Sequence, residues 1–452
     1  MASEETRPPL FTNRKLVNLT IPIIIDALLA IVAGMVDSAM VSSAGEAAVS
    51  AVSLVDSVNL LFIAVFSAIA IGGSVVTTQY IGSRNYQQAS LSANQLLYAA
   101  TAIATVFMLV LLCLRENVLQ LVYGSIAADV FENASIYFFF TLLGYPFFAM
   151  GSSAAAVLRS MGKNRQAVTI TITYNILNVI GNATLIYGFH LGVAGAAIST
   201  TFSRMVYAVL GLVLAHSKKL PARFTKLLKF RLDFSMMRRV LRIGLANGLE
   251  NGLFQIGKVL ISSLVSSFGT IAIAANSVAF TLNNLGWTII GSFGTVLLTV
   301  VGQCVGAAQP EQAKTYVKKI LSVATVLMFA LLGSIFLLRH QLVRIFDFGP
   351  EALEAAAYYT GFSALLSIFS LYSFSFVPMS AFRAAGDIRY AVTVSVSSMF
   401  ALRVALCYVL NALFPTLGLM CVYIGMGADW ALRSVLNIRR FRSGKWLHRR
   451  VI

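Results

Sequence analysis

Residues 315–338 read TYVKKILSVATVLMFALLGSIFLL, and no residue from Ile320 to Leu338 is charged. A helix needs about 20 mostly apolar residues to cross the hydrocarbon core of a bilayer. A transmembrane β-strand would instead alternate apolar and polar residues over about ten positions. Because this run is continuously apolar, it predicts a membrane-spanning helix.

Runs of the same kind extend in both directions along the chain and predict twelve spans. They cover residues 16–42, 47–80, 90–114, 129–155, 166–188, 192–215, 243–267, 271–303, 315–338, 352–378, 389–411 and 416–438. Of the 452 residues, 58% are hydrophobic and 11% are charged, and the mean hydropathy is +0.81. A soluble domain carries about 25% charged residues. The composition excludes an ordinary soluble enzyme and a disordered chain, and it predicts an all-α polytopic membrane protein.

The basic residues set the expected orientation. Of the 34 Lys and Arg residues, 28 fall in segments on the side of the N-terminus, and only Arg115, Arg339 and Arg344 fall in the opposite loops. Cytoplasmic loops carry an excess of Lys and Arg, so we expect both termini in the cytoplasm and the protein in the plasma membrane. The net charge of +17 then reflects topology and attraction to anionic membrane lipids. We expect no nucleic-acid partner.

The two halves of the chain resemble each other at one constant separation, the separation between Gly45 and Gly269. We call this separation the repeat register. The first members of the matched pairs are Gly45, Ala48, Ala51, Ser53, Gln79, Gly82, Gln88, Ala89, Arg159, Gly162 and Arg165. One register across separated blocks indicates an internal duplication. With six spans each, the halves share one orientation and are related by an axis along the membrane normal. This predicts two pseudo-symmetric six-helix bundles that can rock to give alternating access, and it argues against an enzyme.

The expected organisation follows from these spans and from the polar stretch after the sixth. It comprises a cytoplasmic N-terminal tail (1–15), an N-lobe (16–216), a basic cytoplasmic linker (217–242), a C-lobe (243–438) and a basic cytoplasmic tail (439–452). The first residues, MASEETRPPLFT, are polar and contain two prolines. They lack the apolar core of a signal peptide.

Four stretches carry a family resemblance. They are MVDSAMVSSAGEAAVSAVSL (35–54), QYIGSRNYQQA (79–89), LRSMGKNRQA (158–167) and LGVAGAAIST (191–200). They resemble motifs of the multidrug and toxic compound extrusion (MATE) family, and the resemblance runs from about Leu16 to Arg440. It implies an antiporter that exports small amphipathic, often cationic, molecules in exchange for sodium ions or protons.

Asp37 is the first candidate for ion coupling. An ionisable residue at membrane depth is by default a functional candidate, and Asp37 matches the acid of the family motif V-D-x-x-M-V. A carboxylate in a poorly hydrated cavity can exchange a proton near neutral pH. Ionised, it could help to bind a sodium ion, the only metal that the sequence suggests. The alternative is an acid near the outer interface that keeps its contact with water.

The fifth span, TITYNILNVIGNATLIYG, carries a polar stripe. Thr171, Asn175, Asn178 and Asn182 recur at helical spacing on one face. Their amides could bind an alkali cation or a carboxylate, or they could form the interhelical hydrogen bonds that are common in membrane bundles. The family resemblance implies a cation site formed by Asn178, position 182 and Thr200. Asn182 stands where the family has an Asp, which leaves Asp37 as the only carboxylate of this set.

The expected substrate cavity includes Asp26, Glu250, Asn175 and Lys258. Glu250 and Asp26 occupy equivalent positions in the repeat register. Each acid lies about ten residues, or about 15 Å, into its helix, near the bilayer midplane. Two such carboxylates facing a cleft would attract a cationic substrate. The equal alternative is that each acid only supports helix packing.

The remaining intramembrane charges suggest structural roles. Arg403 and Asp429 are interpreted as an ion pair, and Asp56 and Arg204 have no assigned role, with packing as the default. The four cysteines predict neither a disulfide framework nor a zinc site. No phosphate-binding loop or hydrolase motif occurs, so we expect no cofactor beyond the coupling ion, and we expect a monomer. A flippase for lipid-linked sugars is the alternative function.

Overall fold

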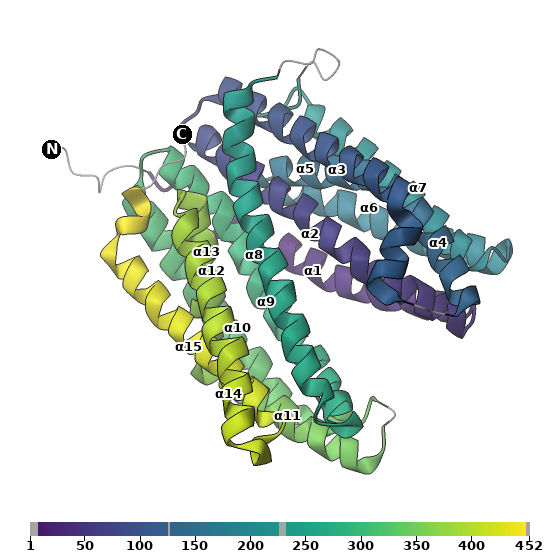
Figure 1. Ribbon diagram of the computed structural model, residues 1–452. Coiled ribbons are helices and arrows are strands. Elements are labelled where there is room, and N and C mark those ends of the chain that lie inside the picture. Colours follow the sequence, from purple (N-terminus) through teal and green to yellow (C-terminus); the bar gives the residue numbers. More distant parts are fainter. Residues whose placement is uncertain (1–7, 125–126, 226–231, 347, 449–452) are drawn as a thin grey trace. The chain divides into compact units, whose positions relative to one another are not determined.

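The computed structural model describes residues 8–124, 127–225, 232–346 and 348–448. Parts of the two predicted tails and of the predicted linker lie outside these ranges. The described residues form helices and loops without a strand, and Figure 1 shows the helices side by side within each half of the chain. In the ranges that the structure describes, the chain forms twelve helical segments, some of them broken, which confirms the all-α prediction with six helices in each half.

The first half contains six helical segments. They are α1 (Asn13–Ser42), α2 (Glu46–Gly82), α3 (Tyr86–Tyr123), α4 with α5 (Ala128–Leu143 and Tyr145–Ser160), α6 with the π-helix η2 (Asn164–Asn182 and Ala183–Gly188), and α7 (Gly192–His216). The α4–α5 pair bends by 45°. Pro146 lies in the first turn of α5, where its missing N–H does not disturb the helix.

The second half repeats this order. It contains α8 (Phe234–Ser266), α9 (Thr270–Gly306), α10 (Pro310–Val343), α11 with α12 (Pro350–Phe369 and Tyr372–Ala385), α13 with the π-helix η3 and α14 (Ile388–Ser398, Met399–Ala405 and Leu406–Leu413), and α15 (Met420–Ser443). Short 3₁₀ turns at Pro415–Leu417 and Lys445–His448 flank α15. Leu371, with φ of 53°, separates α11 from α12.

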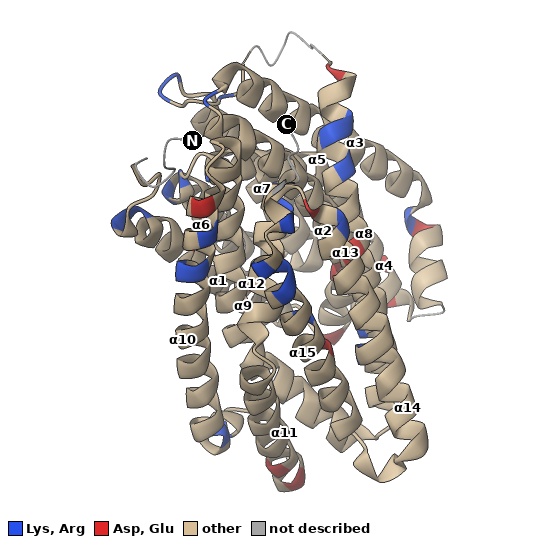
Figure 2. Cartoon of the chain, turned by 90° about the vertical axis from the view of Figure 1, so that its left-hand side faces the viewer, with Lys and Arg blue, Asp and Glu red and all other residues tan. Residues whose placement is uncertain are grey.

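Length and composition mark most of these helices as membrane spans. Among the described residues, eight helices are long and apolar enough to cross a bilayer, and the bent α4–α5 pair would be a ninth. In α10, charged residues lie toward the two ends with a long uncharged stretch between them (Figure 2). This pattern fits a helix whose middle lies in hydrocarbon and whose ends lie in the head-group regions.

Two compact units divide the chain within α1 and within α8. The N-bundle is Ile21–Gly248, and the C-bundle comprises Leu249 onward together with the residues up to Thr20. In the N-bundle, α5 packs against α2, α3 and α7; in the C-bundle, the equivalent α12 packs against α9, α10 and α15. The same pairing in both units agrees with the repeat register.

The turns repeat as closely as the helices. Gly45 and Gly269, each just before a long helix, have φ of 104° and 90°. Only glycine adopts such a conformation at low cost, which explains why this residue recurs in both halves. Arg84 and Ala308, which also occupy equivalent repeat positions, share left-handed backbones with φ of 60° and 56°.

The residues before α1 are anchored within the C-bundle. The backbone N–H groups of Leu10 and Phe11 donate to Gln312 Oε1 at 3.0 Å and to Tyr316 Oη at 2.9 Å. The Phe11 ring is buried and meets the Tyr316 ring edge-on, at 5.7 Å between centroids. This segment therefore docks on α10, although it belongs to the predicted N-terminal tail.

Candidate functional site

Asp37 and Asn182 meet inside the N-bundle. The side-chain nitrogen of Asn182 donates a hydrogen bond to Asp37 Oδ1. Asn182 is fully buried, and its Oδ1 atom makes no hydrogen bond among the described residues. Asp37 lies in the C-terminal part of α1 and is half-buried. A carboxylate beside a buried amide oxygen without a donor forms a pair of hard ligands for a proton or a small cation.

Asn178 and Thr200 form a second contact on the same helix face, one turn earlier. Asn178 Nδ2 donates to Thr200 Oγ1 at 3.2 Å, and Ser199 Oγ donates to the Asn178 carbonyl at 2.8 Å. A Cβ atom at Gly181 would overlap the Ser199 side chain, so α6 and α7 approach closely here. The structure thus places all four predicted coupling residues in two neighbouring contacts, Asp37–Asn182 and Asn178–Thr200.

A polar network that sequence analysis left without a role adjoins Asp37. Asp56 interacts electrostatically with Asp37 and with Arg204. Asn59 links Asp56, at 3.2 Å, to the hydroxyl of Thr141, at 3.3 Å. The carbonyl of Thr141 in turn accepts from Arg204 Nη1 at 2.9 Å. The buried Arg204 therefore supplies a positive charge that acts on the Asp56 carboxylate.

Asp26 pairs with an arginine of its own bundle. Arg159 Nη2, in the last turn of α5, lies 3.0 Å from Asp26 Oδ2, with side-chain exposures of 26% and 15%. Thr171 also interacts with Asp26. Arg159 lies just after the predicted span 129–155, on the side that is expected to be cytoplasmic, yet its side chain reaches the acid of α1.

Glu250 pairs with an arginine in the same way in the C-bundle. Arg383 Nη2, in the last turn of α12, lies 2.6 Å from Glu250 Oε1, with side-chain exposures of 21% and 8%. Both ion pairs join residues that are 133 positions apart. The equal spacing of the two pairs follows from the repeat register, because Asp26 is equivalent to Glu250 and Arg159 is equivalent to Arg383.

Arg403 and Asp429 form the predicted ion pair, with 2.8 Å between Nη2 and Oδ2. Arg433 joins them: its Nε and Nη2 atoms donate to the two Asp429 oxygens at 2.7 and 3.1 Å. Arg433 also donates to Ser398 Oγ and the Ser395 carbonyl. Arg433 is one of the basic residues near the C-terminus that are expected on the cytoplasmic side, yet its side chain is almost fully buried.

The other two predicted cavity residues do not join these contacts. Lys258 is an exposed residue of α8, and it interacts electrostatically with the like charge of Arg403. Asn175 is half-buried on α6, and its Nδ2 atom makes no hydrogen bond among the described residues.

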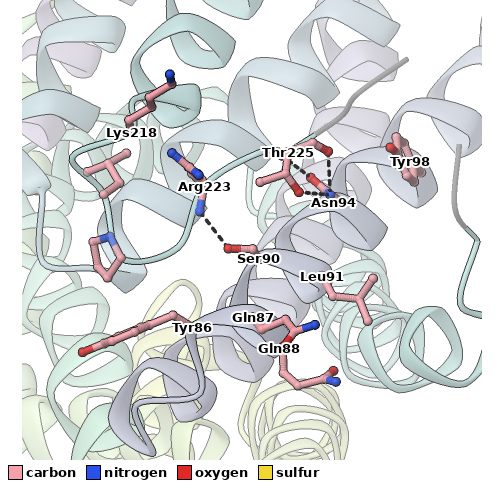
Figure 3. A pocket seen from close by; sticks show the side chains of 12 residues that line it. Tyr86, Gln87, Gln88, Ser90, Leu91, Asn94, Tyr98, Lys218, Arg223 and Thr225 are labelled. Carbon is pink, nitrogen blue, oxygen red and sulfur yellow. Dashed lines mark hydrogen bonds between the residues drawn. The ribbon is translucent and has the colours of Figure 1, made fainter. Parts of the chain in front are cut away.

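Two cavities in the N-bundle contain none of the predicted site residues. A polar cavity of about 680 Å³ lies between α3 and the segment after α7 (Figure 3). Asn94 holds that segment in place by donating to the Thr225 carbonyl at 3.0 Å and accepting from its N–H at 3.2 Å (Figure 3). An apolar cavity of about 690 Å³ is lined by α3, α5, α7 and the start of α8.

The described residues contain no group of three or more His, Cys, Asp and Glu that could hold a metal ion. The four cysteines are free. Asp37 therefore belongs to no such group among these residues, and its side-chain hydrogen bond is to the amide of Asn182.

Comparison with known proteins gives a family match. The family model MatE matches residues 22–184 and again residues 247–409. The two matches have equal length, and each covers most of one half of the chain. The family model therefore recognises the same duplication that the repeat register describes. Together the matches cover well over half of the chain.

The relatives agree over nearly the full length. The chain is 25% identical to the protein named uncharacterized transporter YisQ of Bacillus subtilis, across 99% of this chain and 98% of that one. It is 26% identical to the probable multidrug resistance protein NorM of Thermotoga maritima, across 97% and 94%. A crystal structure of MATE in the bent conformation superposes with a TM-score of 0.88 at 20% identity, across 96% of both chains, which supports the same fold.

Proposed function

Because the chain belongs to the MatE family, we propose that this multi-pass membrane protein is a secondary active antiporter. It exports small amphipathic molecules, organic cations among them, in exchange for a proton or a sodium ion. Its relatives include proteins named for multidrug resistance and multidrug export. The family assignment favours export over the flipping of lipid-linked sugars.

The observation that carries this proposal is the contact between Asp37 and Asn182 inside the N-bundle. An ionised carboxylate accepts the amide N–H, whereas a protonated one would donate to the amide oxygen. Proton uptake therefore reverses the polarity of one buried hydrogen bond and changes how α1 is held against α6. A sodium ion would instead draw the Asn182 oxygen toward Asp37. With one carboxylate rather than two in the contact, the proton is the favoured coupling ion.

The predicted role of Asp26 and Glu250 in cation binding stays a prediction. Each carboxylate already holds an arginine, so a cationic substrate would have to compete with a guanidinium. The double variant Asp26→Asn with Glu250→Gln should lose cationic dye binding if these acids recognise the substrate. Unchanged dye affinity would assign them to bundle architecture instead.

The proposal further places the protein in the plasma membrane as a monomer with both termini in the cytoplasm, because Lys and Arg gather in the segments on that side. The test is ethidium transport in everted vesicles, with the pH and sodium gradients imposed independently. Transport that follows the pH gradient alone, or the sodium gradient alone, identifies the coupling ion. Transport that responds to neither gradient would contradict secondary antiport.

A further inference from the structure

Two buried hydrogen-bond donors in the C-bundle lack acceptors. Arg403 is 8% exposed, and its Nε atom makes no hydrogen bond among the described residues, while its Nη2 atom lies 2.8 Å from Asp429 Oδ2 in the ion pair described above. Trp430 is 2% exposed, and its Nε1 atom likewise has no partner in that part of the chain. The centre of the Arg403 guanidinium lies 5.5 Å from the Trp430 ring. Buried polar groups are nearly always satisfied, so two neighbouring orphan donors indicate a missing acceptor.

Asp429 pairs with Arg403 through the Nη2 atom, and the Nε atom of Arg403 stays without an acceptor in the described part of the chain. Both Asp429 oxygens already accept hydrogen bonds from Arg433, in a two-pronged contact. Such bidentate contacts are the strongest arginine–carboxylate pairs. One carboxylate therefore faces two guanidinium groups, so the three side chains together carry one positive charge that Asp429 does not neutralise.

The excess extends to the neighbouring charges. Glu250 is paired with Arg383 and also interacts electrostatically with Arg433. Lys258 interacts electrostatically with Arg403. Among the described residues, this cluster contains four basic side chains and two acidic ones: Arg383, Arg403, Arg433 and Lys258, with Glu250 and Asp429. Its net charge of about +2 is unusual at membrane depth, where charge is costly.

Aromatic rings lie beside the guanidinium groups of Arg403 and Arg433. Phe254 lies 5.9 Å from Arg403 and 4.8 Å from Arg433. Trp287 and Tyr372 pack against Trp430, with centroids 5.5 and 5.1 Å away. Flat apolar surfaces beside a few polar donors are typical of small-molecule sites.

The repeat shows that this arrangement is not part of the duplicated frame. In the first half, the positions equivalent to Lys258, Arg403, Asp429 and Arg433 hold Gly34, Val179, Met205 and Val209. Arg403 also lies in the π-helix η3, and such segments are frequent at functional sites. These four charges therefore occur at positions whose equivalents in the first half are uncharged, so the shared architecture does not require them.

We propose that Arg403, Trp430 and Lys258 bind an anionic group, such as a carboxylate, sulfonate or phosphate, on an aromatic small molecule. The proposal rests on the transport function above and specifies one substrate class. The unpartnered donors and the net positive charge favour an anion over a cation as the ligand of this cluster. The acidic N-bundle site would then bind the coupling ion, and the basic C-bundle site would bind the anionic substrate.

The test measures binding without any gradient, so that it stays independent of ion coupling. Fluorescein, an aromatic anion, is titrated with the purified full-length chain and followed by fluorescence anisotropy, and ethidium serves as the aromatic cation. Arg403→Gln should weaken fluorescein binding at least tenfold and leave ethidium binding within twofold. Trp430→Phe, which keeps a ring but removes the N–H donor, should weaken fluorescein binding by about threefold.

Arg339→Gln is the matched control, because Arg339 also stacks on a ring, that of Phe336 at 4.6 Å, in the same bundle but outside the cluster. It should leave fluorescein binding unchanged, and Arg403→Lys should retain part of it if Arg403→Gln folds poorly. Equal fluorescein affinity of the parent and Arg403→Gln overturns the proposal, as does an equal loss for both dyes. Full displacement of fluorescein by chloride, compared with gluconate, would show that the cluster holds an inorganic anion and would also overturn it.

Discussion

Asn182 donates its side-chain N–H to the carboxylate of Asp37, 145 positions away in the chain. Thr171 interacts with Asp26 at the same separation. Because both pairs have the same sequence separation, α1 and α6 run parallel to each other along the face that carries Asp26 and Asp37. The polar stripe of α6 therefore connects the two acids of α1, one near each end of the stripe.

Replacing Asp37 with Asn removes the only carboxylate of the proposed coupling contact. We expect gradient-driven ethidium efflux to fall at least tenfold, because the amide neither ionises nor takes up a proton. Asp129→Asn is the control, since Asp129 is an exposed residue at the start of α4. Efflux by Asp37→Asn at the parental rate would remove this residue from the mechanism.

Replacing Asn182 with Asp places two carboxylates in contact. Two adjacent negative charges strengthen binding of an alkali cation, and a ligand that binds only the folded state raises the melting temperature. We expect sodium, compared with choline, to raise the melting temperature of Asn182→Asp more than that of the parent. Asn175→Asp, on the same helix without a carboxylate partner, should show no such gain. A sodium response equal to that of the parent would argue against a cation site here.

The Glu250–Arg383 ion pair should contribute more to stability than its Asp26–Arg159 counterpart. Breaking a buried pair by removing one partner costs about 3–5 kcal/mol, and the partial exposure of Arg383 reduces this to about 2 kcal/mol. Arg383→Gln should therefore lower the melting temperature more than Arg159→Gln, because Glu250 is the less exposed acid. Adding Glu250→Gln should recover part of the loss. Additive losses in the double variant would show that the two residues act separately.

Gly244 allows α8 and α2 to meet at backbone distance within the N-bundle. A Cβ atom at Gly244 would lie 2.8 Å from Ile69 Cα, and one at Gly72 would lie 2.7 Å from Gly244 Cα. Gly244→Ala should destabilise the protein by about 1–3 kcal/mol through overpacking. Gly252→Ala, on the same helix with open space around it, should be neutral or slightly stabilising. Thermal unfolding in detergent compares the two variants, and equal melting temperatures would contradict this packing.

Much of the fold could be predicted from the sequence because hydrophobic runs and the repeat are local or periodic signals. The breaks were harder to predict: the run 129–155 reads as one span, but Gly144 divides it into α4 and α5. Hydropathy averages over such a break, and the π-helical stretches after Asn182 and around Arg403 leave no trace in it.

The contacts of the site were only partly predictable. Arg403–Asp429 follows from two charges on consecutive helices, and its prediction is confirmed. Arg159 and Arg383 were assigned to loops because positive-inside counting uses the position of a residue and ignores the reach of its side chain. A long arginine at a helix end can extend back into the bundle, and the shared repeat register of acids and arginines was the signal that could have revealed both pairs.

Both partners of each acid–arginine pair come from the same half of the chain. During synthesis, Asp26 must enter the bilayer before Arg159 is made, at a cost of about 2.5–3.5 kcal/mol for an unpaired charge near the centre of a helix. The first half can then neutralise that charge before any of the second half leaves the ribosome. Neutralisation of each buried acid during synthesis thus depends on residues of its own half alone.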